Sequence, residues 1–333
     1  MISKRKIIIS YIATAVLLLG LFLIAVNTGS LKVTPMQLFQ GLFVAYDKTV
    51  ATIYDLRFPR IFIAMLGGAA MSVSGVLLQA VMKNPLADPG IIGISSGASF
   101  AAILITAFFP SLFFFTPVFA FLGGVLACVI VYSLSWKNGL NPLRIILVGV
   151  AVNAMFTGLM SAFNSGTGSN YSGAASIVNA NITMKTWDDF QTLLWYVLAG
   201  LVLSVFVSGK CNLLALEDKT ARSLGVNVTT SRFLVSGIAV LLASISTAVI
   251  GPVSFLGLIV PHIARLLVGS NHKVLIPYSV ILGAFTFLLA DTVGRTITSP
   301  YEISASIIMS VIGGPFFILL LRRSDKKHGS YYF

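Results

Sequence analysis

The chain has 333 residues, of which 57% are hydrophobic and only 10% charged, and its mean hydropathy is +0.95. A soluble domain carries about 25% charged residues, so this composition excludes a soluble globular protein and predicts an all-α polytopic membrane protein. The net charge of +12 is typical of a membrane protein with basic cytoplasmic loops and does not indicate nucleic-acid binding.

In chain order, the sequence contains ten apolar runs, and most approach the roughly twenty residues that a helix needs to cross a bilayer. The runs are residues 7–26, 60–82, 91–109, 112–136, 143–163, 191–208, 233–250, 255–268, 275–293 and 303–321. The run at 255–268 is short and contains Pro261, which predicts a partial or broken span. No small-residue cleavage pattern follows the first run, so we expect it to be retained as a span.

Ten crossings place both termini on one side of the membrane. With both termini in the cytoplasm, 16 of the 22 basic residues also face the cytoplasm, as the positive-inside rule requires. The six basic residues left on the outer side are Lys32, Lys48, Arg57, Arg60, Lys185 and Arg295.

Residues 213–232 form the longest polar stretch between apolar runs on the predicted cytoplasmic side. A short helix is predicted over residues 216–224, because acids suit a first turn, a base suits a last turn and a glycine often follows a helix end. The residues that give these signals are Glu217, Asp218, Arg222 and Gly225. Such a helix either covers lipid headgroups or docks into a soluble partner.

Signals of enzyme chemistry are missing from the sequence. It has no G-x-x-x-x-G-K-[S/T] phosphate loop and no H-E-x-x-H motif. Its histidines and its two cysteines have no metal-ligand spacing, so we predict no catalytic residue, metal site or cofactor.

Asp291 lies four residues before Arg295, which predicts a local ion pair. An ion-coupled carrier usually keeps a titratable residue in a span for coupling, and this chain offers little for that role.

Four sequence blocks together resemble one family of membrane proteins. Asn-Pro-Leu-Ala-Asp-Pro-Gly at 84–90, followed by Ser-Ser-Gly at 95–97, is the most specific part of the block at 56–100. The other blocks lie at 215–228, at 251–269, and at 289–296 with 312–323. In this order and spacing they resemble the FecCD/BtuC-type permeases of bacterial ABC importers.

The resemblance implies a BtuC-like type II importer permease in the bacterial cell membrane, with residues 1–333 as a single transmembrane domain. Members of the family carry iron–siderophore complexes, haem or cobalamin. We predict an iron(III)–siderophore as the cargo, with haem or cobalamin as the alternative. The implied partners are a pair of ATP-hydrolysing subunits, a second permease of the same or a sister chain, an extracytoplasmic substrate-binding protein and membrane lipid.

The resemblance also implies roles for three groups of residues. The stretch at 213–232 becomes the element that couples to the ATPase, through Leu216, Glu217, Asp218, Ala221, Arg222, Leu224 and Gly225. The outer arginines that match family positions for docking the binding protein are Arg57, Arg60 and Arg295. Candidates for the translocation path are Asn153, Met155, Met160, Asn164 and Met309.

Each of these assignments has an alternative. The outer arginines could instead anchor headgroups or form internal pairs, Arg57 with Asp55 and Arg295 with Asp291. A methionine in a span is more often a packing residue than part of a path. A secondary transporter or a membrane enzyme are the competing functional classes, and the first needs an intramembrane titratable site while the second needs clustered catalytic groups.

Overall fold

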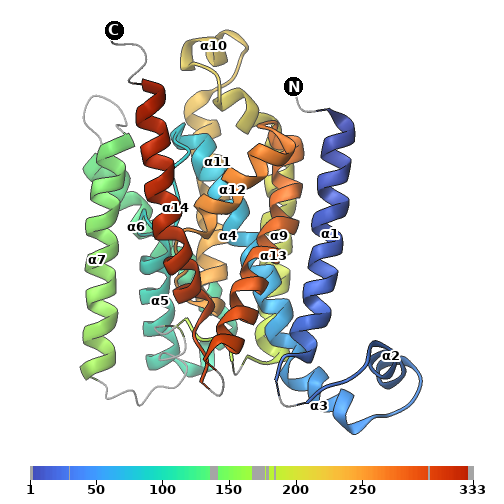
Figure 1. Cartoon of the computed structure of the whole chain (residues 1–333). Coiled ribbons are helices and arrows are strands. Elements are labelled where there is room, and N and C mark those ends of the chain that lie inside the picture. Colours follow the sequence, from blue (N-terminus) through green and yellow to red (C-terminus); the bar gives the residue numbers. More distant parts are fainter. Residues whose placement is uncertain are drawn as a thin grey trace.

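The computed structural model describes residues 3–29, 31–135, 142–166, 177, 180–183, 185–298 and 301–328. Over these residues the protein is a bundle of helices without strands (Figure 1). The elements are α1 (Lys4–Asn27), α2 (Pro35–Phe43), α3 (Lys48–Leu56), α4 (Phe58–Met82), α5 (Ile94–Phe108), the 3-10 helix η1 (Pro110–Phe115), α6 (Thr116–Ser135), α7 (Pro142–Gly166), α9 (Trp187–Leu214), α10 (Asp218–Ser223), α11 (Val228–Ile250), α12 (Leu256–Val268), α13 (His272–Ile297) and α14 (Ala305–His328).

The ten predicted spans are all present as helices. Seven helices in the described residues are long and apolar enough to cross a bilayer, and three shorter apolar helices, α5, α12 and the apolar part of α14, complete the set. The predicted broken span is confirmed. Its helix, α12, has 13 residues and contains Pro261, and a non-helical stretch at 251–255 precedes it.

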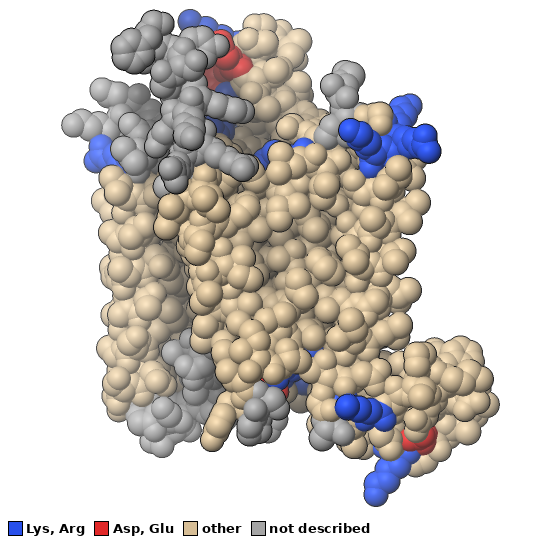
Figure 2. All heavy atoms as spheres, viewed as in Figure 1, with Lys and Arg blue, Asp and Glu red and all other residues tan. Residues whose placement is uncertain are grey.

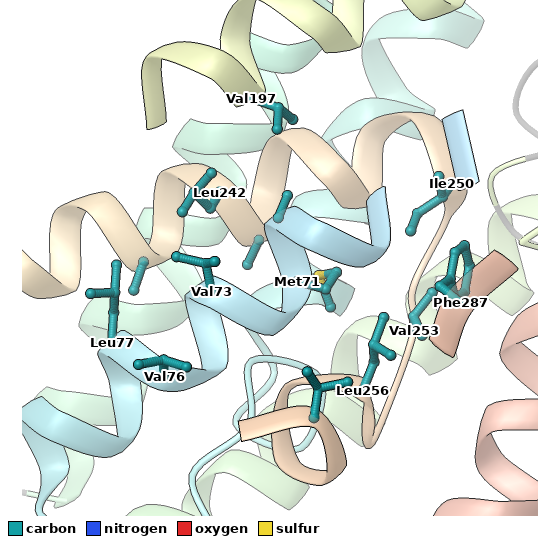
Figure 3. Close-up of a cluster of buried hydrophobic side chains, with 14 of the residues drawn as sticks. Met71, Val73, Val76, Leu77, Val197, Leu242, Ile250, Val253, Leu256 and Phe287 are labelled. Atoms are coloured by element: carbon teal, nitrogen blue, oxygen red, sulfur yellow. The ribbon is translucent and has the colours of Figure 1, made fainter. Parts of the chain in front are cut away.

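Helix α4 lies at the centre of the bundle. Almost every residue from Phe58 to Met82 is buried, and the helix packs against α9, α11, α12 and α13. Figure 3 shows Met71, Val73 and Val76 of α4 among apolar side chains of these neighbours. Helix α4 is therefore buried on all sides, whereas α1 at the edge of the bundle buries only four residues although it is also largely apolar.

Close packing around α4 depends on glycine. A Cβ atom at Gly75 would lie 2.0 Å from the carbonyl oxygen of Gly257 in α12, and a Cβ atom at Gly68 would lie 2.4 Å from that of Gly283 in α13. Helices in a bilayer associate through such contacts because lipid gives no hydrophobic drive for association. The glycines at these positions therefore act in helix packing.

Two non-helical segments, 84–93 and 251–255, enter the bundle and meet inside it. Asp88 is fully buried, and its Oδ1 accepts hydrogen bonds from the backbone amides of Gly90 (2.8 Å) and Ile91 (3.0 Å). A Cβ atom at Gly90 would lie 2.7 Å from the carbonyl oxygen of Val253, which shows how closely the two segments approach. These segments explain why α5 and α12 are shorter than the other spans.

Gln79 of α4 joins the first segment to the start of α12. Its amide donates to the carbonyl oxygens of Ala87 (3.2 Å) and Gly257 (3.1 Å). Its side-chain oxygen accepts from Arg265 Nη1 at 2.5 Å. Backbone polar groups inside a membrane need partners within the protein, and Gln79 supplies two of them from the central helix.

The two ends of the bundle differ in charge. The start of α1, the end of α14 and α10 lie at the same end (Figure 1), and in the view of Figure 2 basic side chains gather at this end while the middle of the visible face is uncharged. This end is the cytoplasmic one by the positive-inside rule. Lys137, which is predicted to lie on the cytoplasmic side in the loop at 136–141, is outside the described residues. Helices α2 and α3 lie at the outer end.

Changing Gly75 to Ala is expected to destabilise the protein by about 3 kcal/mol or more, at the upper end of overpacking costs, because the new methyl group overlaps backbone that cannot move aside. Thermal unfolding in detergent measures the change. Gly20→Ala in α1 is the matched control, since nothing lies within 4 Å of its added methyl group. Equal melting temperatures for the two variants would show that α4 and α12 are not in contact at this point.

Candidate functional site

Residues 213–232 form a turn at the cytoplasmic end, between α9 and α11. The helix in this turn, α10, is shorter than predicted and spans Asp218–Ser223 instead of residues 216–224. Glu217 is its N-cap residue and makes no side-chain capping hydrogen bond, while Arg222 lies in the last turn. Gly225 has a φ of +79°, and its amide donates to the carbonyl oxygen of Arg222 at 2.9 Å. The glycine stop is therefore confirmed.

Asp218 attaches α10 to two core helices. Its Oδ1 lies 2.8 Å from Nζ of Lys83, which follows α4, and 3.0 Å from Nη2 of Arg232 in α11. The hydrogen bond from Lys83, together with the charge of Arg232, holds the pKa of the Asp218 carboxyl below its ordinary value. A lowered carboxyl pKa means that this contact stabilises the fold at neutral pH and is lost as the pH falls through that lower pKa. Lys83 Nζ also donates to the carbonyl oxygen of Leu216.

The exposed surface of the turn combines apolar and charged side chains. Leu216 is 39% exposed and Leu224 is 62% exposed, and Glu217, Lys219 and Arg222 are exposed around them. Ala221 is only 1% exposed, because it packs inward against the bundle. Ala221 is therefore not available to a partner in this conformation, contrary to the prediction, and the exposed apolar side chains among the predicted coupling residues are Leu216 and Leu224.

A second cluster of charges lies at the outer end, where α4 begins and α13 ends. Arg60 donates through Nη2 to Asp291 Oδ1 at 2.8 Å and through Nη1 to Glu302 Oε2 at 2.7 Å. Arg295 Nε lies 3.2 Å from Asp291 Oδ2, which confirms the ion pair predicted from their spacing. Asp291 is 1% exposed. Its charge is neutralised inside the protein by its ion pairs with Arg60 and Arg295.

The three outer arginines predicted to dock a binding protein are all engaged within the chain. Arg60 and Arg295 are 6% and 9% exposed. Arg57 is half-buried and donates through Nη1 to the carbonyl oxygens of Val26 (2.6 Å) and Leu31 (2.7 Å), not to Asp55. In this conformation Arg60 and Arg295 fit the internal-pair alternative, and a partner reaches Arg60 only if Glu302 leaves it. The docking role itself stays a prediction.

Glu302 belongs to this cluster, although sequence reasoning missed it. It lies in the segment between α13 and α14, more than 240 residues from Arg60 in the chain, so no local spacing relates the two. Burial acts to raise the pKa of Glu302, but the hydrogen bond and charge of Arg60 bring it below the ordinary value. Thr183 Oγ1 donates to the same carboxylate oxygen at 2.8 Å. A cavity of about 230 Å³ opens beside this group.

The candidate path residues divide into two groups. Met160 is 4% exposed and Met309 is 2% exposed. Both pack against the chain's own core and cannot face a path between two subunits in this conformation. Met155 in α7 is 48% exposed, and Asn153 and Asn164 on the same helix are half-buried. The path prediction therefore rests on α7.

The architecture defines the class of protein. The solved inward-facing structure of a metal-chelate type ABC transporter matches this chain with a TM-score of 0.78 at 29% identity, over 94% of this chain and 98% of that chain. PsaBC from Streptococcus pneumoniae, solved in complex with Fab, shares the fold with a TM-score of 0.60 at 17% identity, over 86% of this chain and 95% of that chain. The chain is a multi-pass permease subunit of a bacterial ABC importer and is not itself an ATPase.

The sequence profile of the FecCD transport family matches residues 17–323, and the chain belongs to this family. Among curated proteins, it is 39% identical to "Probable heme-iron transport system permease protein IsdF" of Staphylococcus aureus (strain Newman), over 98% of this chain and 99% of the relative. The protein of the same name from strain MSSA476 matches with the same identity and coverage. The resemblance of the four sequence blocks is thereby confirmed.

Changing Asp291 to Asn is expected to cost about 3–5 kcal/mol of stability, because it leaves Arg60 and Arg295 buried without their shared counter-ion. Thermal unfolding in detergent measures the loss. Asp55→Asn, at an exposed carboxylate on α3, serves as the control and is expected to change stability by less than about 0.5 kcal/mol. If Asp291→Asn and Asp55→Asn have the same melting temperature, Glu302 alone is sufficient to neutralise the arginines of the cluster.

Proposed function

We propose that this permease carries haem iron into the cell. The observation that supports haem most directly is the 39% identity, across 98% of the chain, to a permease named for haem-iron transport. The siderophore chosen from the sequence is less well supported than haem, which was its alternative. A metal chelate remains the broader class, in keeping with the 29% identical structure described as a metal-chelate type transporter.

The energy for transport enters, in this proposal, at the cytoplasmic turn. The exposed Leu216 and Leu224 fit a cleft in an ATP-hydrolysing subunit, and Glu217, Lys219 and Arg222 supply charges around them. Because Leu216 is already partly buried, the two leucines contribute less than about 6 kcal/mol before ordering costs. The contacts from Asp218 to Lys83 and Arg232 allow a push on α10 to reach α4 and α11. Different contacts in the two ATPase states shift the permease between inward-open and outward-open populations.

The proposal places the two remaining protein partners at the outer end of the bundle and along α7 and α14. An extracytoplasmic binding protein docks at the outer end, near Arg57, Arg60 and Arg295, and a carboxylate on its lobe takes the place of Glu302 on Arg60. A second permease, of the same or a sister chain, covers the exposed faces of α7 and α14. Asn153, Met155 and Asn164 of α7 then face the path between the two subunits.

Capture of the ATPase tests the coupling role of the turn. The wild-type chain is expected to co-purify in mild detergent with the ATPase subunit of its own transport system, and a variant carrying both Leu216→Asp and Leu224→Asp is expected to lose it. Tyr301→Asp makes the same kind of change at the outer end, at a side chain that is 80% exposed, and should retain capture. Equal capture by all three proteins would place the ATPase contact elsewhere, and no capture by any of them would favour an ATP-independent carrier.

Growth on defined iron sources tests the cargo. Deleting this chain from its bacterium is expected to abolish growth on haemin as the sole iron source, and the wild-type chain should restore it while the Leu216→Asp, Leu224→Asp variant should not. Growth on ferric siderophores is the parallel measurement. Loss of growth on a siderophore with growth on haemin intact would replace haem with that siderophore and leave the family assignment unchanged.

A further inference from the structure

Helices α2 and α3 form a small hairpin at the outer end of the bundle. A Cβ atom at Gly41 would lie 2.6 Å from the side chain of Val50, so the two helices are in close contact. Gln37 Nε2 donates to Asp47 Oδ2 at 2.9 Å, and Asp47 caps α3 by accepting from the amides of the first turn. The hairpin is therefore a folded unit with its own internal contacts.

The other face of α2 is apolar and exposed. Met36, Phe39 and Phe43 follow the i, i+3, i+7 spacing of one helix face and are 62%, 56% and 75% exposed. The rings of Phe39 and Phe43 lie 5.3 Å apart, and Tyr46 beyond the helix is 84% exposed. A contiguous apolar patch of this kind on a helix too short to span a bilayer marks an interaction surface.

The position of α2 indicates what covers this face. Figure 1 shows α2 beside the bundle, level with the outer end of α1 and on the side opposite α7. Helix α1 exposes Ile12, Val16 and Leu19 along its length, as a helix bordering lipid does. The apolar face of α2 thus continues a lipid-facing surface at the depth where the hydrocarbon gives way to headgroups, a depth that favours aromatic side chains.

A cavity of about 680 Å³ lies where α1 approaches α2. Its lining combines the apolar side chains of Leu23 and Ile24 with polar side chains that include Asn27, Lys32 and Gln37. Apolar side chains close to a lysine ammonium match a phospholipid, whose acyl chains meet α1 and whose phosphate meets the Lys32 ammonium.

We propose that α2 is an interfacial helix, with Met36, Phe39 and Phe43 inserted into the outer leaflet and a phospholipid headgroup held between α1 and α2 at Lys32. The chain runs from α3 through Arg57 directly into α4, and α3 packs against α4. An anchored hairpin therefore fixes the depth of the central helix in the bilayer while other parts of the bundle move. The proposal does not depend on the cargo or on the coupling role of α10.

Nitroxide accessibility in lipid nanodiscs tests the proposal on the full chain without any partner protein. With Cys128 and Cys211 changed to Ala, single labels are placed at Phe43→Cys, at Val16→Cys as the lipid reference and at Lys48→Cys as the aqueous reference on the same hairpin. Collision rates with oxygen, which concentrates in lipid, and with a nickel chelate, which stays in water, are compared. The label at position 43 is expected to give a ratio of oxygen to nickel collisions nearer to that at Val16 than to that at Lys48.

A ratio at position 43 nearer to that at Lys48 would overturn the proposal, because the face would then lie in water and be suited to a protein partner. A second variant, Lys32→Gln, isolates the headgroup contact. It is expected to reduce the amount of phospholipid that co-purifies with the chain, measured by native mass spectrometry, and Lys48→Gln should leave that amount unchanged. Equal lipid retention by both variants would remove Lys32 from the site.

Discussion

The need to satisfy backbone polar groups inside the bilayer shapes the centre of this protein. Segments 84–93 and 251–255 leave helical geometry at membrane depth, where no water is available to replace the lost hydrogen bonds. They are tolerated because they lie within the bundle, where Asp88 accepts from two amides and Gln79 donates to the carbonyls of Ala87 and of Gly257 at the start of α12. The close glycine contacts of α4 follow from the same requirement, since they leave no room for lipid.

Helix α4 connects the two functional ends of the molecule. At its outer end Arg60 binds Asp291 and Glu302, and just past its inner end Lys83 binds Asp218 of the cytoplasmic turn. With 25 residues, the helix spans about 37 Å at 1.5 Å per residue. The continuous, buried helix thus links the charge cluster at the outer end to the cytoplasmic turn.

The distribution of charge is consistent with a transporter that takes its energy from outside the chain. Two buried carboxylates could serve an ion-coupled mechanism, but two arginines hold Asp291 at the outer boundary and the backbone amides of Gly90 and Ile91 bind Asp88. The cytoplasmic turn instead offers exposed leucines beside charged side chains, which is what a helix needs to dock in a soluble subunit. This arrangement agrees with membership of an importer family whose ATPase is a separate chain.

The sequence by itself determined the ten spans, their orientation, the family, the Asp291–Arg295 pair and the Gly225 helix stop, because each depends on hydropathy, on charge asymmetry or on residues close together in the chain. Only the tertiary structure decided that Ala221 is buried while Leu224 is exposed, that Glu302 completes the Arg60 cluster, and that Met160 and Met309 pack inside. In a bilayer almost every span is apolar all round, so hydropathy does not show which face meets lipid, a partner or the core. That choice is made by helix packing between residues far apart in the sequence.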